Sequence, residues 1–157
     1  MLTGVRNLAK TSSTPGKTQL INHYLVDQEW YLVDLPGYGY ASLSKKEREA
    51  LSVMIESYLN GRSNLMNVYL LVDCRHDPLD IDLEFMEWLA GNGLPFTIVF
   101  TKADKLNRQE RNRSLARYRK ALESTWEELP PFIMTSAEAG EGKKELLLEM
   151  KEIRNRF

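Results

Sequence analysis

The segment Trp30 to Tyr40, WYLVDLPGYGY, joins an apolar run to a carboxylate and then to a glycine turn. We expect Asp34 to end a strand at the rim of a sheet, because open α/β sheets bind ligands beyond the carboxyl ends of their strands. Gly37 leaves room for a phosphate beside its N–H. The spacing Asp-x-x-Gly therefore favours a phosphate-sensing switch, and an ordinary Asp/Pro/Gly turn is the alternative.

A second polar cluster, Thr101-Lys102-Ala103-Asp104, directly follows the apolar run Phe96 to Phe100. An aspartate accepts two N–H bonds from the Watson–Crick edge of guanine, and a lysine stem can lie along the face of the ring. Adenine offers the wrong donor pattern to such a carboxylate. Lys and Asp also begin ordinary helices, so the tetrad by itself leaves that alternative open.

The triplet Thr135-Ser136-Ala137 follows the last apolar segment, Phe132 to Met134. Its backbone N–H groups can face the oxygen of a base, and a plain strand-to-helix turn is the alternative. A threonine-bearing loop, Asp-x-x-Gly, Thr-Lys-x-Asp and Ser-Ala follow one another along the chain. This joint order favours one nucleotide site assembled at several strand ends.

These polar turns need a scaffold in which strands alternate with helices. We expect an antiparallel hairpin of Leu20 to Val26 and Trp30 to Asp34, then strands over Val68 to Val72, Phe96 to Phe100 and Phe132 to Met134. The run Val68 to Val72 is almost entirely apolar, as in a strand that is covered on both faces.

Helices complete the alternating pattern. We expect them from an N-cap at Ser44 to about Asn60, and over Asp80 to Ala90, Gln109 to Glu128 and Lys143 to Arg154. Ser44 and Glu47 have capping-box spacing, and Gly61 can end the first helix in the left-handed conformation. The pattern predicts a mostly parallel, three-layer α/β sheet.

Composition limits the class of protein. The 157 residues are 43% hydrophobic and 27% charged, which predicts one domain over 1–157 with a buried core. The net charge of −1 argues against general attraction to nucleic acid or membrane. Cys74 is the single cysteine, and no signal peptide or long apolar span is evident, so we expect a cytoplasmic protein.

One stretch departs from this balanced charge. Lys105 to Lys120 holds seven basic residues and a single acidic one, Glu110. A solvated helix face explains it simply, and contact with RNA phosphates is the alternative.

Five segments together resemble the EngB family of bacterial ribosome-assembly GTPases, a group within the translation-factor-related P-loop GTPases. The resemblance extends over essentially the whole chain, and the PGYGY run followed by VDxRH is its most specific feature. The segments are Thr14 to Gln19 with Asn22, Asp34 to Tyr40, Leu71 to His76, Thr101 to Lys105 and Gly140 to Gly142.

The resemblance implies roles for individual residues. Thr18 would bind Mg²⁺ and sense the γ-phosphate, Asp34 would hold Mg²⁺ through water, and the Gly37 N–H would meet the γ-phosphate. Lys102 and Asp104 would read guanine. The full implied set is Gly16, Lys17, Thr18, Gln19, Leu20, Asp34, Leu35, Pro36, Gly37, Thr101, Lys102, Ala103, Asp104, Thr135, Ser136 and Ala137.

The resemblance also implies a function: a monomeric GTP/GDP switch that assists assembly of the large ribosomal subunit, touches ribosomal RNA through Lys105 to Lys120, and is needed for normal cell division and septation. Tyr38 stands where Ras-like GTPases carry their water-orienting glutamine, so hydrolysis should be slow. No catalytic residue is assigned. The alternative is a nucleotide-free α/β module that binds RNA or the ribosome.

One feature of the family is missing. Its members open with a strand, a Gly-x-x-x-x-Gly-Lys-Ser phosphate loop and a helix. Gly16-Lys17-Thr18 does not complete such a loop, because the earlier glycine would fall at Thr11. Met1 to Gly4 resembles the tail of the helix that follows the loop. We therefore expect a P-loop GTPase fold without the first strand, the phosphate loop and most of the first helix, and with impaired GTP binding.

Overall fold

The computed structural model describes residues 20–38 and 44–157, and these residues fall into two compact units. One unit holds the described residues up to 63 and the other holds residues 64–157. The predicted loop residues Gly16, Lys17, Thr18 and Gln19 lie outside the described residues. A single domain over 1–157 stays a prediction.

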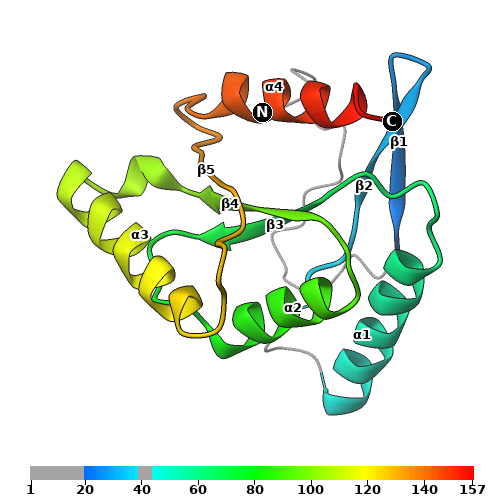
Figure 1. Ribbon diagram of the computed structural model, residues 1–157, viewed down its shortest axis with the longest axis horizontal. Helices are drawn as coiled ribbons and strands as arrows, with labels where there is room; N and C mark the ends of the chain where they lie inside the picture. Colours follow the sequence, from blue (N-terminus) through cyan, green and yellow to red (C-terminus); the bar gives the residue numbers. More distant parts are fainter. Residues whose placement is uncertain (1–19, 39–43) are drawn as a thin grey trace. The chain divides into compact units, whose positions relative to one another are not determined.

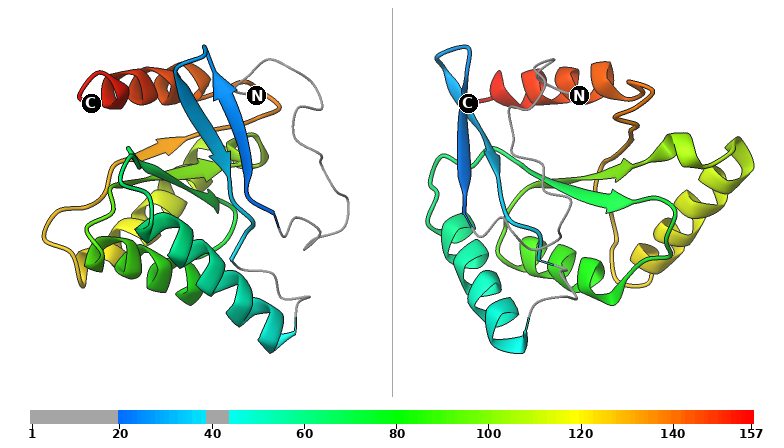
Figure 2. Two further views of the ribbon diagram at one scale, coloured as in Figure 1. Left: turned by 90° about the vertical axis from the view of Figure 1, so that its right-hand side faces the viewer. Right: turned by 180° about the vertical axis from the view of Figure 1, so that it is seen from behind.

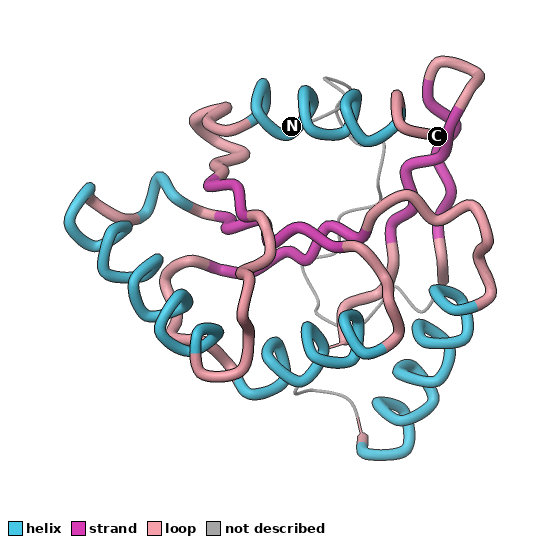
Figure 3. The backbone as a smooth tube through the Cα atoms, in the orientation of Figure 1, coloured by secondary structure: helices cyan, strands magenta, loops and turns pink. Residues whose placement is uncertain are grey.

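The first unit opens with an antiparallel hairpin of β1 (Asn22–Val26) and β2 (Trp30–Asp34), which confirms the predicted pairing (Figure 3). Asp27 and Gln28 make the turn with φ values of 52° and 59°. Two consecutive residues with positive φ give the turn a backbone twist that matches the right-handed twist of the flanking strands. The strand begins at Asn22 and not at Leu20, whose side chain is exposed.

Helix α1 (Lys45–Asn60) begins with the predicted capping box. The Glu47 N–H donates to Ser44 Oγ at 3.3 Å, and the Ser44 N–H donates to Glu47 Oε2 at 2.8 Å. The predicted left-handed cap at Gly61 is wrong: its φ is −80°, because the last turn continues right-handed and the Gly61 N–H donates to the Ser57 carbonyl at 3.0 Å.

The second unit holds a parallel sheet in the order β3-β4-β5, made by β3 (Val68–Asp73), β4 (Phe96–Thr101) and β5 (Phe132–Met134). Asp73 is in register with Thr101. The carboxyl ends of the three strands therefore share one edge, as the sequence predicted.

Helices lie on both faces of this sheet, so the unit has three layers. Figures 1 and 2 show α2 (Asp80–Gly91) and α3 (Arg108–Glu123) on one face and α4 (Lys143–Arg154) on the other. None of the helices in the described part has the length and apolar character to cross a membrane.

Alternate residues of β4 supply the two halves of the core. The Phe100 ring meets Tyr118 of α3 edge to face, with centroids 4.9 Å apart. Val99 points the opposite way and packs with Ile133 and with Leu146 of α4. Burial on both faces explains why Phe96, Ile98, Val99 and Phe100 of this strand are all apolar.

Two predictions about this unit are wrong in part. Leu71 of β3 is 66% exposed, so β3 is not covered on both faces by the described residues. Helix α3 ends at Glu123 instead of Glu128. The Ser124 hydroxyl donates to the Ala121 carbonyl at 2.7 Å and competes with further helix, and the chain then turns so that Trp126 packs on Phe96.

Candidate functional site

The edge where β3, β4 and β5 end carries the residues that the sequence predicted would read a base. Beyond β4, Lys102 adopts a left-handed conformation (φ 61°, ψ 31°) and leads into a short 3-10 turn, Ala103–Lys105. This conformation costs a non-glycine residue about 1 kcal/mol, and such strain gathers at functional sites.

The loops after β4 and β5 are joined through their backbones. The Ala103 N–H donates to the Thr135 carbonyl at 3.0 Å, and the Thr135 N–H donates to the Phe100 carbonyl at 2.6 Å. The Thr101 hydroxyl donates to the Val72 carbonyl at 3.1 Å. These hydrogen bonds show that Thr101, Ala103 and Thr135 hold the loops in place. The side chains of the neighbouring residues Lys102 and Asp104 remain to contact a ligand.

Asp104 is held as a charged acceptor. Its Oδ1 accepts a 2.5 Å hydrogen bond from the Ser136 hydroxyl, and its Oδ2 lies 3.0 Å from Lys105 Nζ. Ser136, and then Lys105, keep the pKa of Asp104 below its usual value. Each carboxylate oxygen retains acceptor capacity, so the oriented group can still receive two N–H donors from a base.

Lys105 links this carboxylate to the loop after β5. Its ammonium lies 2.9 Å from Glu138 Oε2 as well as 3.0 Å from Asp104. The two carboxylates, Glu138 first, raise the pKa of Lys105. The sequence placed Lys105 in the basic stretch and in the segment Thr101 to Lys105 that resembles the EngB family. It gave Glu138 no role, because residues so far apart show no shared spacing.

Two of the three predicted N–H donors of the last loop are already used. The Thr135 N–H serves Phe100, and the Ser136 N–H donates to the Glu141 carbonyl at 3.1 Å. Within the triplet, the exposed Ala137 keeps the N–H without a described acceptor. Of the three N–H groups predicted to face a base oxygen, the N–H of Ala137 is therefore the one that remains available.

Asp73 joins this site although the sequence assigned it no role. Arg75 donates from Nε to Oδ1 at 2.9 Å and from Nη2 to Oδ2 at 2.7 Å, and Lys102 Nζ donates to Oδ2 at 2.8 Å. Hydrogen bonding from Arg75, reinforced by Lys102, holds the pKa of Asp73 well below its usual value. Its place at the end of the strand beside β4 is the signal that could have revealed it.

The predicted phosphate-side residues belong to the first unit. Asp34 ends β2 with an exposed side chain, Pro36 is buried, and Leu35 and Gly37 are half-buried. The Asp34 carboxylate makes no hydrogen bond or ion pair with another described residue. Leu20, the remaining described member of the predicted set, is exposed.

The Asp34 carboxylate, which has no hydrogen-bond or ion-pair partner among the described residues, has the oxygen chemistry that Mg²⁺ prefers. The described residues contain no cluster of three or more His, Cys, Asp or Glu side chains that could hold a metal. Nucleotide-bound Mg²⁺ usually needs only one or two carboxylates, since phosphate oxygens and water complete its shell.

The basic stretch divides into paired and free cations. Arg111 Nη1 lies 2.7 Å from Glu141 and Arg117 Nε lies 2.6 Å from Asp77. Arg108, Arg113 and Lys120 are exposed on α3 and have no ion-pair partner among the described residues.

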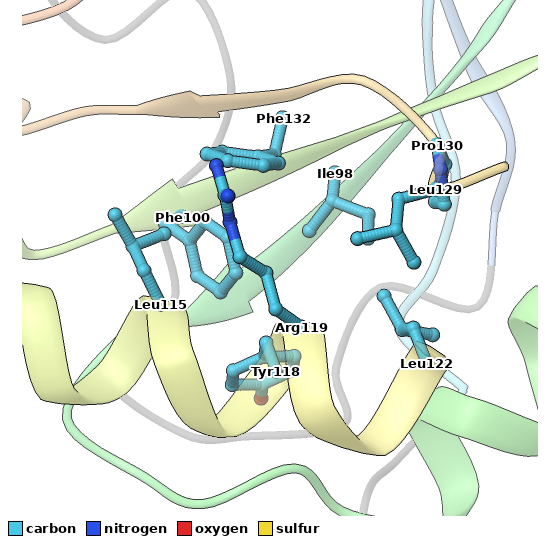
Figure 4. A pocket seen from close by; sticks show the side chains of 9 residues that line it. All are labelled: Ile98, Phe100, Leu115, Tyr118, Arg119, Leu122, Leu129, Pro130 and Phe132. Atoms are coloured by element: carbon cyan, nitrogen blue, oxygen red, sulfur yellow. The ribbon is translucent and has the colours of Figure 1, made fainter. Parts of the chain in front are cut away.

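Arg119 has a third kind of environment. Figure 4 shows its side chain crossing a small apolar groove between α3 and the strands, toward the Phe132 ring. The guanidinium carbon lies 5.0 Å from the ring centroid, a cation–π distance. Arg119 therefore contributes to packing as well as to surface charge.

The comparisons with known proteins agree with this geometry. A family model described as "50S ribosome-binding GTPase" matches residues 1–102. A probable GTP-binding protein EngB from Porphyromonas gingivalis is 56% identical over 147 residues, which cover 94% of this chain and 73% of that protein. The chain belongs to the EngB family. The matched segment of this chain spans 73% of the length of that EngB relative.

Solved structures support the fold. The crystal structure of a probable GTP-binding protein EngB matches with a TM-score of 0.76 and 21% identity, over 93% of this chain and 88% of that one. Apo elongation factor SelB from Methanococcus maripaludis matches with a TM-score of 0.60 and 25% identity, over 80% of this chain but 25% of SelB. The EngB-family chain thus has the P-loop GTPase fold.

Proposed function

We propose that this EngB-family protein is a cytoplasmic GTP/GDP switch that assists assembly of the large ribosomal subunit and supports normal cell division and septation. The observation that carries the nucleotide part is the Asp104 carboxylate, held by Ser136 at 2.5 Å and Lys105 at 3.0 Å. The description of the matching family model supports the ribosomal part.

The base site selects guanine by hydrogen bonding. Asp104 accepts from the two N–H donors on the Watson–Crick edge, and the Ala137 N–H is free to donate to the base oxygen. The stem of Lys102 covers the face of the ring. Thr101, Ala103, Thr135 and Ser136 hold these groups in place.

The phosphate-side roles in this proposal come from the resemblance to the EngB family. The Gly37 N–H would meet the γ-phosphate, Thr18 would sense it, and Asp34 would hold Mg²⁺ through water. The other residues that the resemblance assigns to this role are Gly16, Lys17, Gln19, Leu20, Leu35 and Pro36. When bound, Mg²⁺ neutralises charge on the phosphate oxygens. With Tyr38 after Gly37, intrinsic hydrolysis is slow, or depends on a partner or a potassium ion.

The 157-residue polypeptide by itself binds nucleotide weakly in this proposal. It contains no Gly-x-x-x-x-Gly-Lys-Ser segment, so several charge-assisted hydrogen bonds of about 1.5 to 3 kcal/mol each are missing from the phosphate side. The residues proposed to read the base, Lys102 and Asp104, and the segment Asp34 to Gly37 are present in this polypeptide.

The ribosomal contact is made by α3 of a monomeric protein. Arg108, Arg113 and Lys120 are exposed and unpaired among the described residues, and ribosomal RNA presents phosphates to them. These same free cations favour a second candidate function, a nucleotide-free α/β module that binds RNA or the ribosome.

Calorimetric titration of the 157-residue polypeptide with GDP and with ADP tests the nucleotide proposal. We expect guanine-selective binding no tighter than about 1 mM, equivalent to about 4 kcal/mol. Micromolar GDP binding would contradict the impairment. Equal affinity for ADP and GDP would refute the guanine-reading site and favour the nucleotide-free module that binds RNA or the ribosome. The Asp104→Ala variant, which lacks the carboxylate proposed to read the base, is the control.

A further inference from the structure

A carboxylate and an ammonium meet at the sheet edge beside the base-reading loop. Asp73 Oδ2 lies 2.8 Å from Lys102 Nζ. Asp73 is in register with Thr101, the residue before Lys102, so the pair bridges the ends of adjacent strands. The Asp73 side chain is 20% exposed and that of Lys102 is 52% exposed, which leaves the lysine open to a ligand.

Arg75 fixes the orientation of this carboxylate. Its Nε and backbone N–H donate to Oδ1 at 2.9 and 3.1 Å, while Nη2 donates to Oδ2 at 2.7 Å. A two-pronged contact of this kind sets the plane of a carboxylate as well as its position. The contact with Arg75 therefore fixes the direction in which Oδ2 of Asp73 faces the Lys102 ammonium.

The two polar side chains of the tetrad diverge from a common turn. Lys102 runs toward the end of β3 to reach Asp73, whereas Asp104 points to Ser136 beyond β5. A planar ligand whose edge is read by Asp104 can then lie against the aliphatic stem of Lys102.

We propose that Asp73 is a positioning residue for the guanine base: it holds the Lys102 ammonium, so that the lysine stem is extended before nucleotide arrives. This inference rests on the proposed nucleotide site. A free lysine side chain loses much rotamer freedom when it is ordered, and a residue that orders it in advance removes this cost from binding.

A double-mutant cycle on the 157-residue polypeptide tests whether Asp73 acts through Lys102. GDP binding is measured by NMR titration at millimolar concentrations for wild type, Asp73→Asn, Lys102→Met and the double variant. We expect Asp73→Asn to weaken GDP binding about tenfold in wild type and to have no effect when residue 102 is methionine. Asp77→Asn is the matched control, because Asp77 lies on the same loop and pairs with Arg117 instead.

An equal loss in both backgrounds would show a merely structural role and overturn the inference. Tighter binding by Asp73→Asn would also overturn it, because Asp73 would then be withholding Lys102 from the base. Absence of GDP binding by wild type at these concentrations would refute the guanine-selective base site of the proposed function and this inference with it, a result distinct from either of these.

A second measurement needs no ligand. The ¹⁵Nζ resonance of Lys102 in nucleotide-free protein reports an ordered ammonium through slow proton exchange. We expect this resonance in wild type and in Asp77→Asn, and its loss in Asp73→Asn. A Lys102 resonance that is unchanged by Asp73→Asn would show that the pair does not order the lysine, and would overturn the inference.

Discussion

The Ser136 hydroxyl donates a 2.5 Å hydrogen bond to Oδ1 of Asp104, across the gap between the loops that follow β5 and β4. The Ala103 N–H, which donates to the Thr135 carbonyl at 3.0 Å, holds the same two loops together one residue earlier. The carboxylate of Asp104, which we propose reads the base, is therefore oriented before any ligand is present.

Replacing Asp104 by Asn should change base choice. Asn keeps one acceptor and adds a donor, so it no longer matches the two N–H groups of guanine and suits the additional carbonyl of xanthine. We expect GDP binding to weaken and xanthosine diphosphate to become the better ligand in NMR competition titrations. Unchanged preference for GDP would show that Asp104 does not read the base.

Gly142, which precedes α4, tolerates no side chain. Its φ is +73°, and a Cβ there would lie 2.2 Å from the Met134 carbonyl oxygen and 2.9 Å from Thr135 Cγ2. We expect Gly142→Ala to lower the free energy of unfolding by about 3 kcal/mol or more in urea titrations.

Gly140 is the matched control for this substitution. Its φ is +69°, but no atom lies within 4 Å of the position of a Cβ. Gly140→Ala should therefore cost only the left-handed conformation, about 1 kcal/mol. Equal costs for the two variants would mean that the contact with Met134 relaxes freely.

The free cations of α3 should dominate ribosome binding. Phosphate contacts release counterions, so affinity falls with salt by about 0.7 to 0.9 log units per contact for each log unit of salt. We expect the triple variant of Arg108, Arg113 and Lys120 to Ala to flatten this slope by about 2, measured by pelleting with large ribosomal subunits across a salt series.

Arg111→Ala with Arg117→Ala is the control for that experiment, because these arginines already pair with Glu141 and Asp77. The double variant should lose stability and keep most of its salt slope. Slopes that change equally in both variants would show that pairing does not select the cations that bind phosphate.

Asp73 should make stability depend on acid pH. Its pKa in the folded protein lies well below the usual 3.8, mainly because of Arg75. A lowered pKa gives stability that is complete above the unfolded value and is lost as pH falls through the folded value.

The comparison with Asp73→Asn isolates this contribution. Wild type should be the more stable protein at about pH 6, and the difference should narrow below about pH 4 in urea titrations. A difference that stays constant from neutral to acid pH would mean that the charge of Asp73 is not what stabilises the fold.

Local patterns in the sequence were enough to predict most elements and the outline of the site. The alternation of apolar runs with capped helices predicted the hairpin, the parallel strands and the capping box of Ser44 and Glu47. These features depend on residues a few positions apart, and local chemistry is decisive there. Where local signals competed, at Gly61 and at the end of α3, the predictions were wrong.

The pairing of side chains was decided by the tertiary structure alone. Asp73 meets Lys102, Ser136 meets Asp104 and Arg117 meets Asp77, each across more than two dozen residues of sequence. No periodicity links such positions, because parallel strands are joined by long crossover connections that separate their neighbouring ends in sequence. The sequence therefore determined which side chains are available to read a base or contact RNA. The tertiary structure decided which of them are oriented by hydrogen bonds, which form ion pairs with each other, and which have no ion-pair partner among the described residues.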